Sequence, residues 1–343
     1  MTGDGHLNYS QLLRAVIDGL SLTREQTHRA FGQIMDGAWS ESQVAGLLVA
    51  MAAKGETVEE IAGAAQAMRE HVLPIDAGGL DVVDTCGTGG TGLATFNIST
   101  AAAMVAAGAG VKVAKHGNRT STRPSGSADV LAVLGVNIDA DAASVARCLR
   151  EAGVCFCFAV RCHPAMKFAV PVRKALGVRT IFNLLGPLTN PAGAKAQVMG
   201  VFDAALTEKI ARVLGALGSR RAMVVHAEDG LDELSTVSPT QVSELRGGHV
   251  ATRTVTGEQF GLAPAKFEDL AVNSADESAR VVRSVLTGKH GPHRDIVLLN
   301  AAAAIMVSEA AADIPAGIEI ARHSIDTGAA MRALDRLIAV SNG

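Results

Sequence analysis

A glycine-rich segment that follows a β-rich run is the part of this sequence best suited to binding an anion. Residues 84–100 contain Gly87, Gly89, Gly90 and Gly92, and an alanine-rich run follows from about Ala101. Glycines let a backbone approach a ligand closely, and the first turn of a helix offers unpaired N–H groups at the positive end of its dipole. The pattern therefore predicts a phosphate site between a strand and a helix.

The dinucleotide-binding fingerprint is one alternative for this loop. Gly87, Gly89 and Gly92 satisfy G-x-G-x-x-G, but that fingerprint also needs an Asp or Glu about twenty residues later, after the next strand. The next predicted strand, 111–115, instead leads into the cationic run from Lys115 to Arg119. This cationic run favours a ligand with a further phosphate group over a dinucleotide, whose ribose would need a carboxylate here.

An acidic pair and an arginine complete the set of residues with evident chemistry. Asp232 and Glu233 follow a predicted strand at 222–226, and carboxylate oxygens suit Mg²⁺ shared with substrate phosphates. A surface acidic turn is the alternative, but the carboxyl end of a parallel strand favours a site. Arg173 presents a guanidinium that fits a carboxylate, and it is equally compatible with a surface helix.

Taken together, these segments resemble the anthranilate phosphoribosyltransferase family, whose patterns are close to GTGGDG, NxST and KHGNR. The resemblance continues in the family's order through 125–129, Arg173, 182–191 and 229–233, so it spans nearly the whole chain. The block at 182–191 separates this family from the similarly folded pyrimidine nucleoside phosphorylases.

The resemblance implies transfer of the phosphoribosyl group from 5-phosphoribosyl 1-diphosphate to anthranilate in tryptophan biosynthesis, with pyrophosphate released and no protein nucleophile. It implies donor-binding residues Gly87, Thr88, Gly89, Gly90, Thr95, Asn97, Ser99, Thr100, Lys115 and Ser127. The implied acceptor-binding residues are Gly87, Asn118, His116, His163 and Arg173. Two Mg²⁺ ions are expected at Ser99, Asp232 and Glu233.

Periodicity predicts an α/β fold with two parts. Residues 9–71 read as four short amphipathic helices, with Thr23 and Gln26 forming a capping box. We expect a small helical domain at 1–73, completed by a segment around 165–190, and a large α/β domain at 80–343. The predicted strands, 82–84, 111–115, 156–159, 180–183 and 222–226, alternate with helices, which predicts a mainly parallel sheet flanked by helices. Residues 250–255 read as a further, exposed strand. The resemblance implies the nucleoside phosphorylase/phosphoribosyltransferase architecture and a homodimer formed through the helical domain.

Composition limits the possible partners. The 343 residues carry a formal net charge of −3 and only 3% aromatic residues, which argues against a groove for nucleic acid. A catalytically silent relative that binds nucleic acid would show basic excess and would lack the acidic pair. The five cysteines contain no CxxC pair, and neither a signal peptide nor a membrane span is visible. We expect a cytoplasmic protein with reduced thiols.

Several positions depart from the family's pattern around the substrate path. Thr91 replaces the usual Asp of the glycine loop, and Thr122-Arg123 replaces a serine pair. Val160, Cys162 and Phe168 replace Pro, an aromatic residue and His, respectively. These changes leave open a related enzyme that acts on another aromatic amine. A nucleoside phosphorylase fits the loop and the acidic pair less well.

Overall fold

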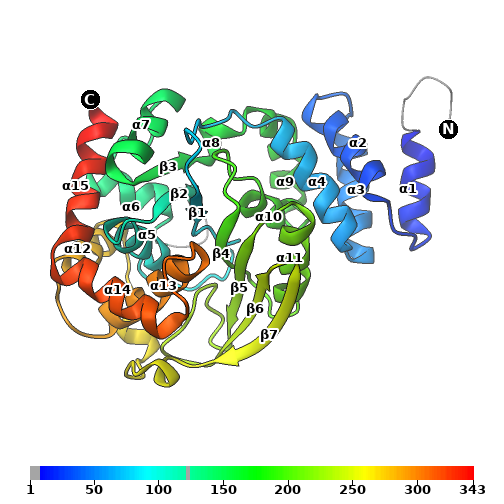
Figure 1. Cartoon of the computed structure of the whole chain (residues 1–343). Helices are drawn as coiled ribbons and strands as arrows, with labels where there is room; N and C mark the ends of the chain where they lie inside the picture. Colours follow the sequence, from blue (N-terminus) through cyan, green and yellow to red (C-terminus); the bar gives the residue numbers. More distant parts are fainter. Residues whose placement is uncertain (1–7, 121–123) are drawn as a thin grey trace.

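The structure is a computed structural model that describes residues 8–120 and 124–343, so Thr122 and Arg123 lie outside the described residues. Four helices, α1 to α4, form one end of the molecule, and α12, α14 and α15 lie at the opposite end, with the sheet between them (Figure 1). Within the described ranges, no helix is both long and apolar enough to cross a membrane.

The N-terminal part is built from α1 (Tyr9–Ile17), α2 (Arg24–Met35), α3 (Glu41–Lys54) and α4 (Val58–Glu70). Three of these helices begin with a capping box, at Thr23, Ser40 and Thr57. In each box the hydroxyl accepts from a first-turn N–H, and the side chain three residues later accepts from the N–H of the cap. The box predicted at Thr23 is therefore confirmed.

The large part contains one seven-stranded sheet in the order β3-β2-β1-β4-β5-β6-β7. The parallel strands are β1 (Val82–Asp84), β2 (Lys112–Gly117), β3 (Val154–Phe158), β4 (Ala196–Gly200) and β5 (Arg221–Ala227). The antiparallel hairpin β6 (Thr240–Arg246) and β7 (His249–Val255) extends one edge. The predicted fold class, a small helical domain with a large, mainly parallel α/β domain, is confirmed.

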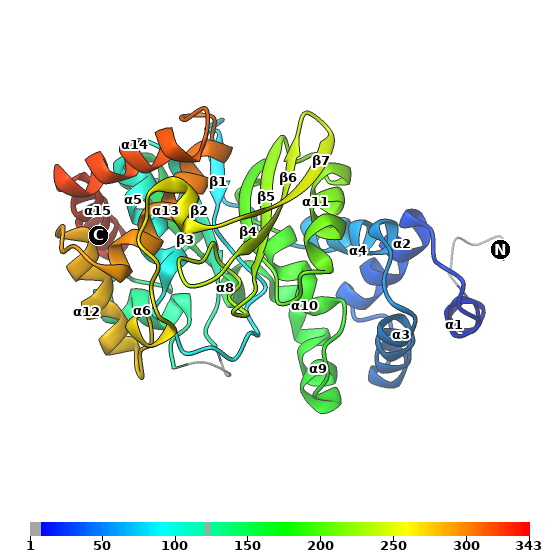
Figure 2. The same cartoon turned by 90° about the horizontal axis from the view of Figure 1, so that it is seen from below.

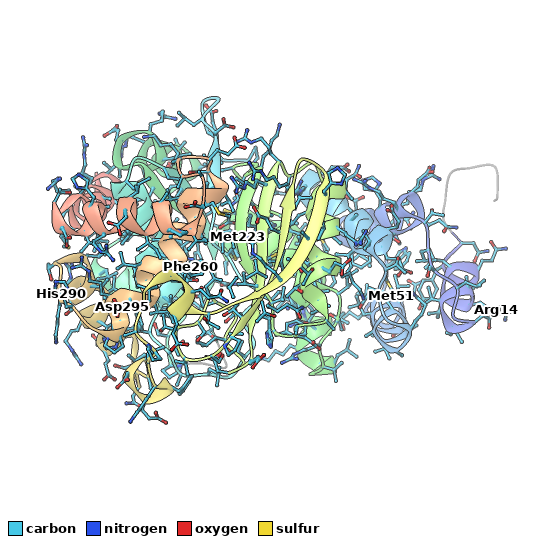
Figure 3. All side chains as sticks on the ribbon, turned by 60° about the horizontal axis from the view of Figure 1, so that its bottom comes forward. Arg14, Met51, Met223, Phe260, His290 and Asp295 are labelled. Atoms are coloured by element: carbon cyan, nitrogen blue, oxygen red, sulfur yellow. The ribbon has the colours of Figure 1, made fainter. Side chains whose placement is uncertain are left out.

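The two faces of the sheet face different cores, as β5 shows. Met223 and Val225 join the core shared with α5 and α13, whereas Ala222 and Val224 join the core that continues into the helical part. This alternation follows from the two-residue period of a strand. Figure 3 labels one buried methionine from each core, Met51 and Met223.

The helices that follow the first strand are α5 (Ile98–Gly108), α6 (Ser127–Leu134), α7 (Ala142–Ala152), α8 (Ala159–Cys162), α9 (Val170–Leu176), α10 (Phe182–Leu185), α11 (Leu206–Ala216), α12 (Ala275–Leu286), α13 (Pro292–Val307), α14 (Ile314–Asp326) and α15 (Ala329–Asn342). Short 3₁₀ turns lie at Pro164–Phe168, Gly186–Leu188, Gly257–Phe260 and Phe267–Asp269.

Helices α9 and α10 lie beside the N-terminal helices although they are more than a hundred residues further along the chain (Figure 2). Ala169, Val172 and Phe182 belong to the same buried cluster as α2 to α4, and the rings of Phe31 and Phe182 are 5.5 Å apart. This later segment therefore shares the core of the helical part.

The strand predicted at 180–183 is wrong. Thr180 begins a turn in which its N–H donates to Asn183 Oδ1 at 3.0 Å, and α10 follows. The local hydrogen bond of Asn183 competes with strand pairing, which β-branched residues alone do not reveal. Strands β4 and β6 were not predicted.

Candidate active site

The glycine loop begins where β1 ends and is held against the ends of β4 and β5. Gly89, Gly90 and Gly92 have φ angles of 62°, 75° and 73°, a region that side chains with a Cβ rarely adopt. The N–H of Thr88 donates to Gly200 O at 2.8 Å, and that of Gly89 donates to Asp232 Oδ2 at 3.0 Å. The loop is thus joined to the acidic turn after β5.

The acidic pair also contacts the start of α5. Glu233 Oε1 accepts from the N–H of Ser99 at 3.3 Å, and Asp232 is buried. A Cβ on Gly200 would overlap the backbone of Asp232, so this close approach requires glycine. The structure therefore brings together the three predicted metal ligands, Ser99, Asp232 and Glu233.

Lys115, near the end of β2, places a buried cation beside these groups. Its Nζ donates to Thr85 O at 3.1 Å, to Thr85 Oγ1 at 3.2 Å and to Ser99 Oγ at 3.1 Å. A small cavity beside the carboxylates is lined by Thr85, Gly87, Ser99, Ala102, Val198, Gly200, Asp232, Glu233 and Asn300. The helix start, the glycine loop and the acidic pair thus line one space, and Lys115 contacts two of the lining residues, Thr85 and Ser99.

Asn97, the residue before α5, is fixed by two serines. Its N–H donates to Ser278 Oγ at 3.0 Å, and its Oδ1 accepts from Ser125 Oγ and Ser278 Oγ, each at 2.7 Å. Its side chain therefore connects α5 to the segment before α6 and to α12. The orientation of Asn97 is set by residues from distant parts of the chain.

Three further predicted donor-binding residues, Thr95, Thr100 and Ser127, do not line this cavity. Thr95 is buried in an isolated β-bridge with Ala271 and does not line the cavity. Thr100 is fully buried, and its Oγ1 has no hydrogen-bond partner among the described residues. Ser127 begins α6 and donates to Asn118 O at 3.3 Å.

The two predicted histidines form a buried pair. Nε2 of His116 and Nε2 of His163 are 3.1 Å apart. Burial, followed by the neighbouring His163, lowers the pKa of His116 to about 3, and burial lowers the pKa of His163 to about 4. Both rings are therefore neutral near pH 7, with one donating to the other.

Arg173 lies in α9, half-buried, with its guanidinium carbon 5.6 Å from the centroid of the Phe182 ring. Burial lowers its pKa. Asn118 is exposed and accepts from the N–H of Arg119 at 2.8 Å. These predicted acceptor residues come from the segment packed on the helical core and from the loop after β2.

A second group with metal-ligating atoms is formed by Asp84, Cys86 and His116, whose ligand atoms lie within 4.8 Å of one another. Thiol and imidazole ligands do not suit Mg²⁺. Both Asp84 oxygens already accept hydrogen bonds, from His116 N at 3.1 Å and Asn190 Nδ2 at 2.7 Å, and burial raises the pKa of Asp84 to about 6. We interpret this group as a structural link between β1, β2 and the segment of Asn190.

Sequence reasoning missed residues that shape the site through contacts distant in sequence. A glycine directly after an apolar run was the available signal for Gly200. Lone serines, threonines and asparagines carry no such signal. The residues that were given no role are Thr85, Ser125, Asn190, Gly200, Ser278 and Asn300, although Ser125 and Asn190 lie in segments that carry the resemblance.

Comparisons with known proteins first define the class. Residues 79–331 match the model of the glycosyl transferase family a/b domain, and residues 10–72 match that of the glycosyl transferase family helical bundle domain. The fold and the site therefore define a two-part glycosyl transferase.

Individual relatives narrow this class. An anthranilate phosphoribosyltransferase of Symbiobacterium thermophilum is 52% identical over 95% of this chain and 96% of its own length. The crystal structure of the Thermus thermophilus enzyme superposes with a TM-score of 0.92 at 40% identity, covering 96% of this chain and 99% of that one. The Saccharomyces cerevisiae enzyme in complex with PRPP and Mg gives a TM-score of 0.87 at 28% identity, with 97% and 98% covered. The chain belongs to the anthranilate phosphoribosyltransferase family, as its motifs indicated.

Proposed function

We propose that this protein transfers the phosphoribosyl group of 5-phosphoribosyl 1-diphosphate to anthranilate, giving N-(5-phosphoribosyl)anthranilate and pyrophosphate in tryptophan biosynthesis. Family membership supports this reaction, and related yeast structures are described with PRPP and Mg and with 4-fluoroanthranilate. The observation that carries the proposal is the single space lined by the start of α5, the glycine loop and the acidic pair, with Lys115 bonded to Ser99, one of the lining residues.

The chemistry explains why this arrangement suits the reaction. The bond between ribose C1 and the diphosphate oxygen breaks, the amine nitrogen bonds to C1, and the amine then loses a proton. Negative charge accumulates on the departing diphosphate, so preorganised N–H groups and a cation stabilise the transition state. The N–H groups of Gly89 and Ser99 and the ammonium of Lys115 supply these contacts.

The oxygen donors at the cavity fit Mg²⁺. Asp232, Glu233 and the Ser99 hydroxyl offer hard ligands beside the place of the diphosphate, a donor set typical of Mg²⁺ that also binds substrate phosphates. When bound, Mg²⁺ neutralises charge on the leaving group. We assign two ions to this pair, in keeping with the family resemblance.

For the acceptor, we assign the carboxylate of anthranilate to Arg173 and the aromatic amine to the neighbourhood of Gly87, Asn118, His116 and His163. The neutral histidine pair places no cation next to an amine that must lose a proton. The guanidinium of Arg173 offers two parallel N–H donors to a carboxylate.

The organisation of the protein completes the proposal. We assign residues 1–73, with 165–190, to a small domain and 80–343 to the large donor-binding domain. We further propose a homodimer formed through the helical domain, located in the cytoplasm. The shared core of α2 to α4 with α9 and α10 supports the assignment of the later segment to the small domain.

The test is pyrophosphate release by purified protein with Mg²⁺ and 5-phosphoribosyl 1-diphosphate, against a panel of aromatic amines, with each product identified by mass. We expect anthranilate to be used with the highest kcat/KM. A different amine used preferentially would indicate the paralogous enzyme. No release with any amine would overturn the proposal.

A further inference from the structure

Arg179, in the loop between α9 and α10, connects two parts of the site. Its Nη2 donates to Gly90 O at 2.9 Å, and its guanidinium carbon lies 4.2 Å from the centroid of the Phe202 ring. Phe202 follows β4 two residues after Gly200, whose carbonyl accepts from Thr88. The glycine loop is thus attached to the end of β4 through Thr88 and to Arg179 through Gly90.

The atom that Arg179 contacts determines what this contact can do. A diphosphate binds N–H groups, whereas Arg179 binds a carbonyl, so the contact does not compete with a bound anion. Because a trans peptide places its C=O and N–H on opposite sides, the bond to Gly90 O directs the N–H of Thr91 away from Arg179. By contrast, the N–H of Gly89 is held by Asp232 Oδ2, which is also a proposed metal ligand.

We propose that Arg179 is a positioning residue that holds the glycine loop in its donor-binding shape and couples it to the segment carrying Arg173. This inference rests on the proposed function, because it concerns the same donor site. The Phe202 ring fixes the guanidinium by a cation–π contact, which favours Arg over Lys. Arg179 itself contacts neither reacting group; it acts through Gly90.

A merely structural role predicts a different outcome. The Arg179 side chain is exposed, so its truncation leaves no buried cavity. If Arg179 makes only a surface contact, its truncation should leave the affinities for both the phosphoribosyl donor and the acceptor unchanged. A positioning role would raise the KM of the donor while kcat at saturating donor stays close to that of the wild type.

The experiment compares Arg179→Ala, Arg179→Lys and Phe202→Leu with the wild type, and uses Arg212→Ala as the matched control. Arg212 is an exposed arginine of α11 paired with Glu208, outside the proposed site. Donor affinity is measured by calorimetry with Mg²⁺ and 5-phosphoribosyl 1-diphosphate alone, and steady-state rates give KM and kcat for each substrate.

For Arg179→Ala we expect the donor Kd and KM to rise roughly tenfold or more, the usual effect of losing a charged hydrogen bond. Arg179→Lys keeps a hydrogen-bond donor for Gly90 O, and Phe202→Leu keeps the guanidinium. Both variants should therefore show intermediate Kd values for the phosphoribosyl donor, and Arg212→Ala should keep the wild-type value.

An unchanged Kd for the phosphoribosyl donor in Arg179→Ala overturns the inference. The inference is also overturned if Arg179→Ala binds the phosphoribosyl donor more weakly while Phe202→Leu and Arg179→Lys keep the wild-type Kd. That result would indicate that residue 179 binds phosphate directly. A wild-type protein that binds the phosphoribosyl donor but transfers to no amine would overturn the proposed transfer, whereas the donor Kd values of the variants test this inference separately.

Discussion

At the residue scale, Asp232 and Glu233 each accept a backbone N–H that the proposed diphosphate would use. The bonds from Gly89 and Ser99 hold the carboxylates where the leaving group is expected. Carboxylate and phosphate oxygens are both anionic acceptors, so they compete for the same N–H groups. With the diphosphate bound, these N–H groups would serve its oxygens, and Asp232 and Glu233 would hold Mg²⁺ that neutralises charge on the leaving group.

The first prediction concerns a variant that lacks this acidic pair. Asp232→Ala with Glu233→Ala should lower turnover at least ~10²–10³-fold, because charge on the leaving group is no longer neutralised. The fold should persist, which circular dichroism and thermal unfolding check. Glu228→Ala, an exposed acid of the same turn, is the control. Near-wild-type turnover of the double variant in saturating Mg²⁺ would show that the metal assignment is wrong.

The second prediction concerns the acceptor. Arg173→Ala should raise the KM of anthranilate far more than that of the donor, since losing a charged hydrogen-bond partner costs roughly 1.5–3 kcal/mol. Lys174→Ala, its exposed neighbour on α9, should leave both values unchanged. Equal rises in the two KM values would count against carboxylate binding by Arg173.

The third prediction concerns the buried histidine pair and pH. Burial lowers the pKa of His163 from 6.5 to about 4, so the unfolded chain takes up this proton first as the pH falls. The stability contributed by the neutral ring is complete above pH 6.5 and is lost progressively between pH 6.5 and about 4. Going from pH 7 to 5 should cost about 2 kcal/mol through this group.

Urea unfolding at both pH values checks this prediction. His163→Gln should lose less stability than the wild type over the same interval, and the exposed His249→Gln should behave like the wild type. Burial raises the pKa of Asp84, so this carboxyl changes the stability in the opposite direction as the pH falls. Its contribution is the same in the wild type and the variants and therefore cancels when they are compared. Identical pH dependence in wild type and His163→Gln would contradict the assignment.

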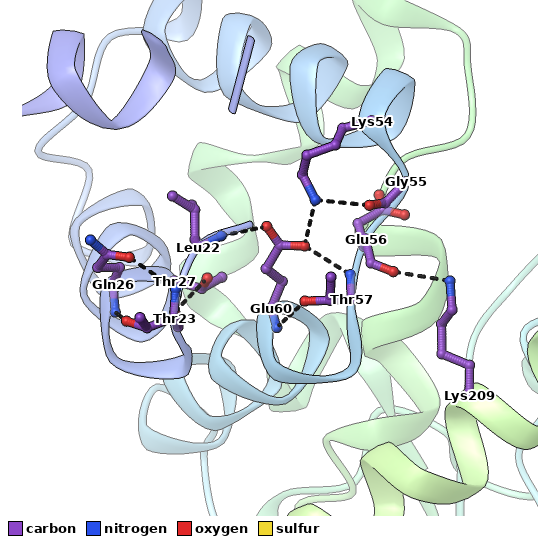
Figure 4. A network of polar contacts seen from close by, with 10 residues as sticks. All are labelled: Leu22, Thr23, Gln26, Thr27, Lys54, Gly55, Glu56, Thr57, Glu60 and Lys209. Atoms are coloured by element: carbon purple, nitrogen blue, oxygen red, sulfur yellow. Dashed lines mark hydrogen bonds and ion pairs between the residues drawn. The ribbon is translucent and has the colours of Figure 1, made fainter. Parts of the chain in front are cut away.

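At the scale of elements, helix α4 is anchored by a buried carboxylate (Figure 4). Glu60 accepts hydrogen bonds from Leu22 N at 2.9 Å, Thr57 N at 2.8 Å and Lys54 Nζ at 2.9 Å. Burial raises the pKa of this carboxyl, but these three bonds outweigh it and lower the pKa overall. One side chain therefore joins the starts of α2 and α4 to the end of α3.

Glu60→Ala should destabilise the protein by roughly 3–5 kcal/mol, because it leaves two N–H groups without their acceptor and the half-buried Lys54 ammonium with only Gly55 O. Urea unfolding measures the change. Glu59→Ala removes an exposed acid from the same first turn and should cost only about 0.3–1 kcal/mol through the helix dipole. Equal unfolding midpoints for the two variants would refute the anchoring role.

The two parts of the molecule also meet at this network. Lys209 Nζ of α11 donates to Glu56 O at 3.0 Å, just before α4 (Figure 4). In the linker, Leu73 N donates to Cys162 O at 2.8 Å and Ile75 N donates to Pro191 O at 3.0 Å. The position of the small domain is thus fixed by contacts of α11 with the residue before α4 and by contacts of the linker after α4.

At the scale of the whole molecule, the helical end exposes large apolar side chains. Ile17, Leu20 and Val49 are 66%, 60% and 44% exposed, respectively, and α1 packs on α3. Burying such a surface is favourable, which agrees with the proposed dimer through this domain.

Sedimentation velocity should show a dimer for the wild type and a monomer for Ile17→Lys with Leu20→Lys, since two buried charges oppose association. Val133→Lys, on the exposed face of α6 in the large domain, is the control and should stay dimeric. A monomeric wild type, or a dimeric double variant, would contradict this interface.

Local signals explain what the sequence by itself determined. The glycine loop, the capping box at Thr23, the alternation of strands and helices and the acidic pair each depend on neighbouring residues, and each was recognisable from residue type and spacing. Joined in order along the chain, the motifs identified the family. The misread segment at 180–183 shows the limit, because there the side chain of Asn183 decided between turn and strand.

Contacts between distant residues were decided only by the tertiary structure. Gly89 meets Asp232 across 143 positions, Asn97 meets Ser278 across 181, and Arg179 meets Gly90 across 89. Parallel strands bring their carboxyl ends to one edge whatever their separation in sequence, so the packing of β1, β4 and β5 brings Gly89 to Asp232. The other two pairs depend on how α12 and the loop between α9 and α10 pack beside the glycine loop. No local pattern marks a serine that orients an asparagine or an arginine that holds a glycine loop, because these roles exist only once the sheet has assembled.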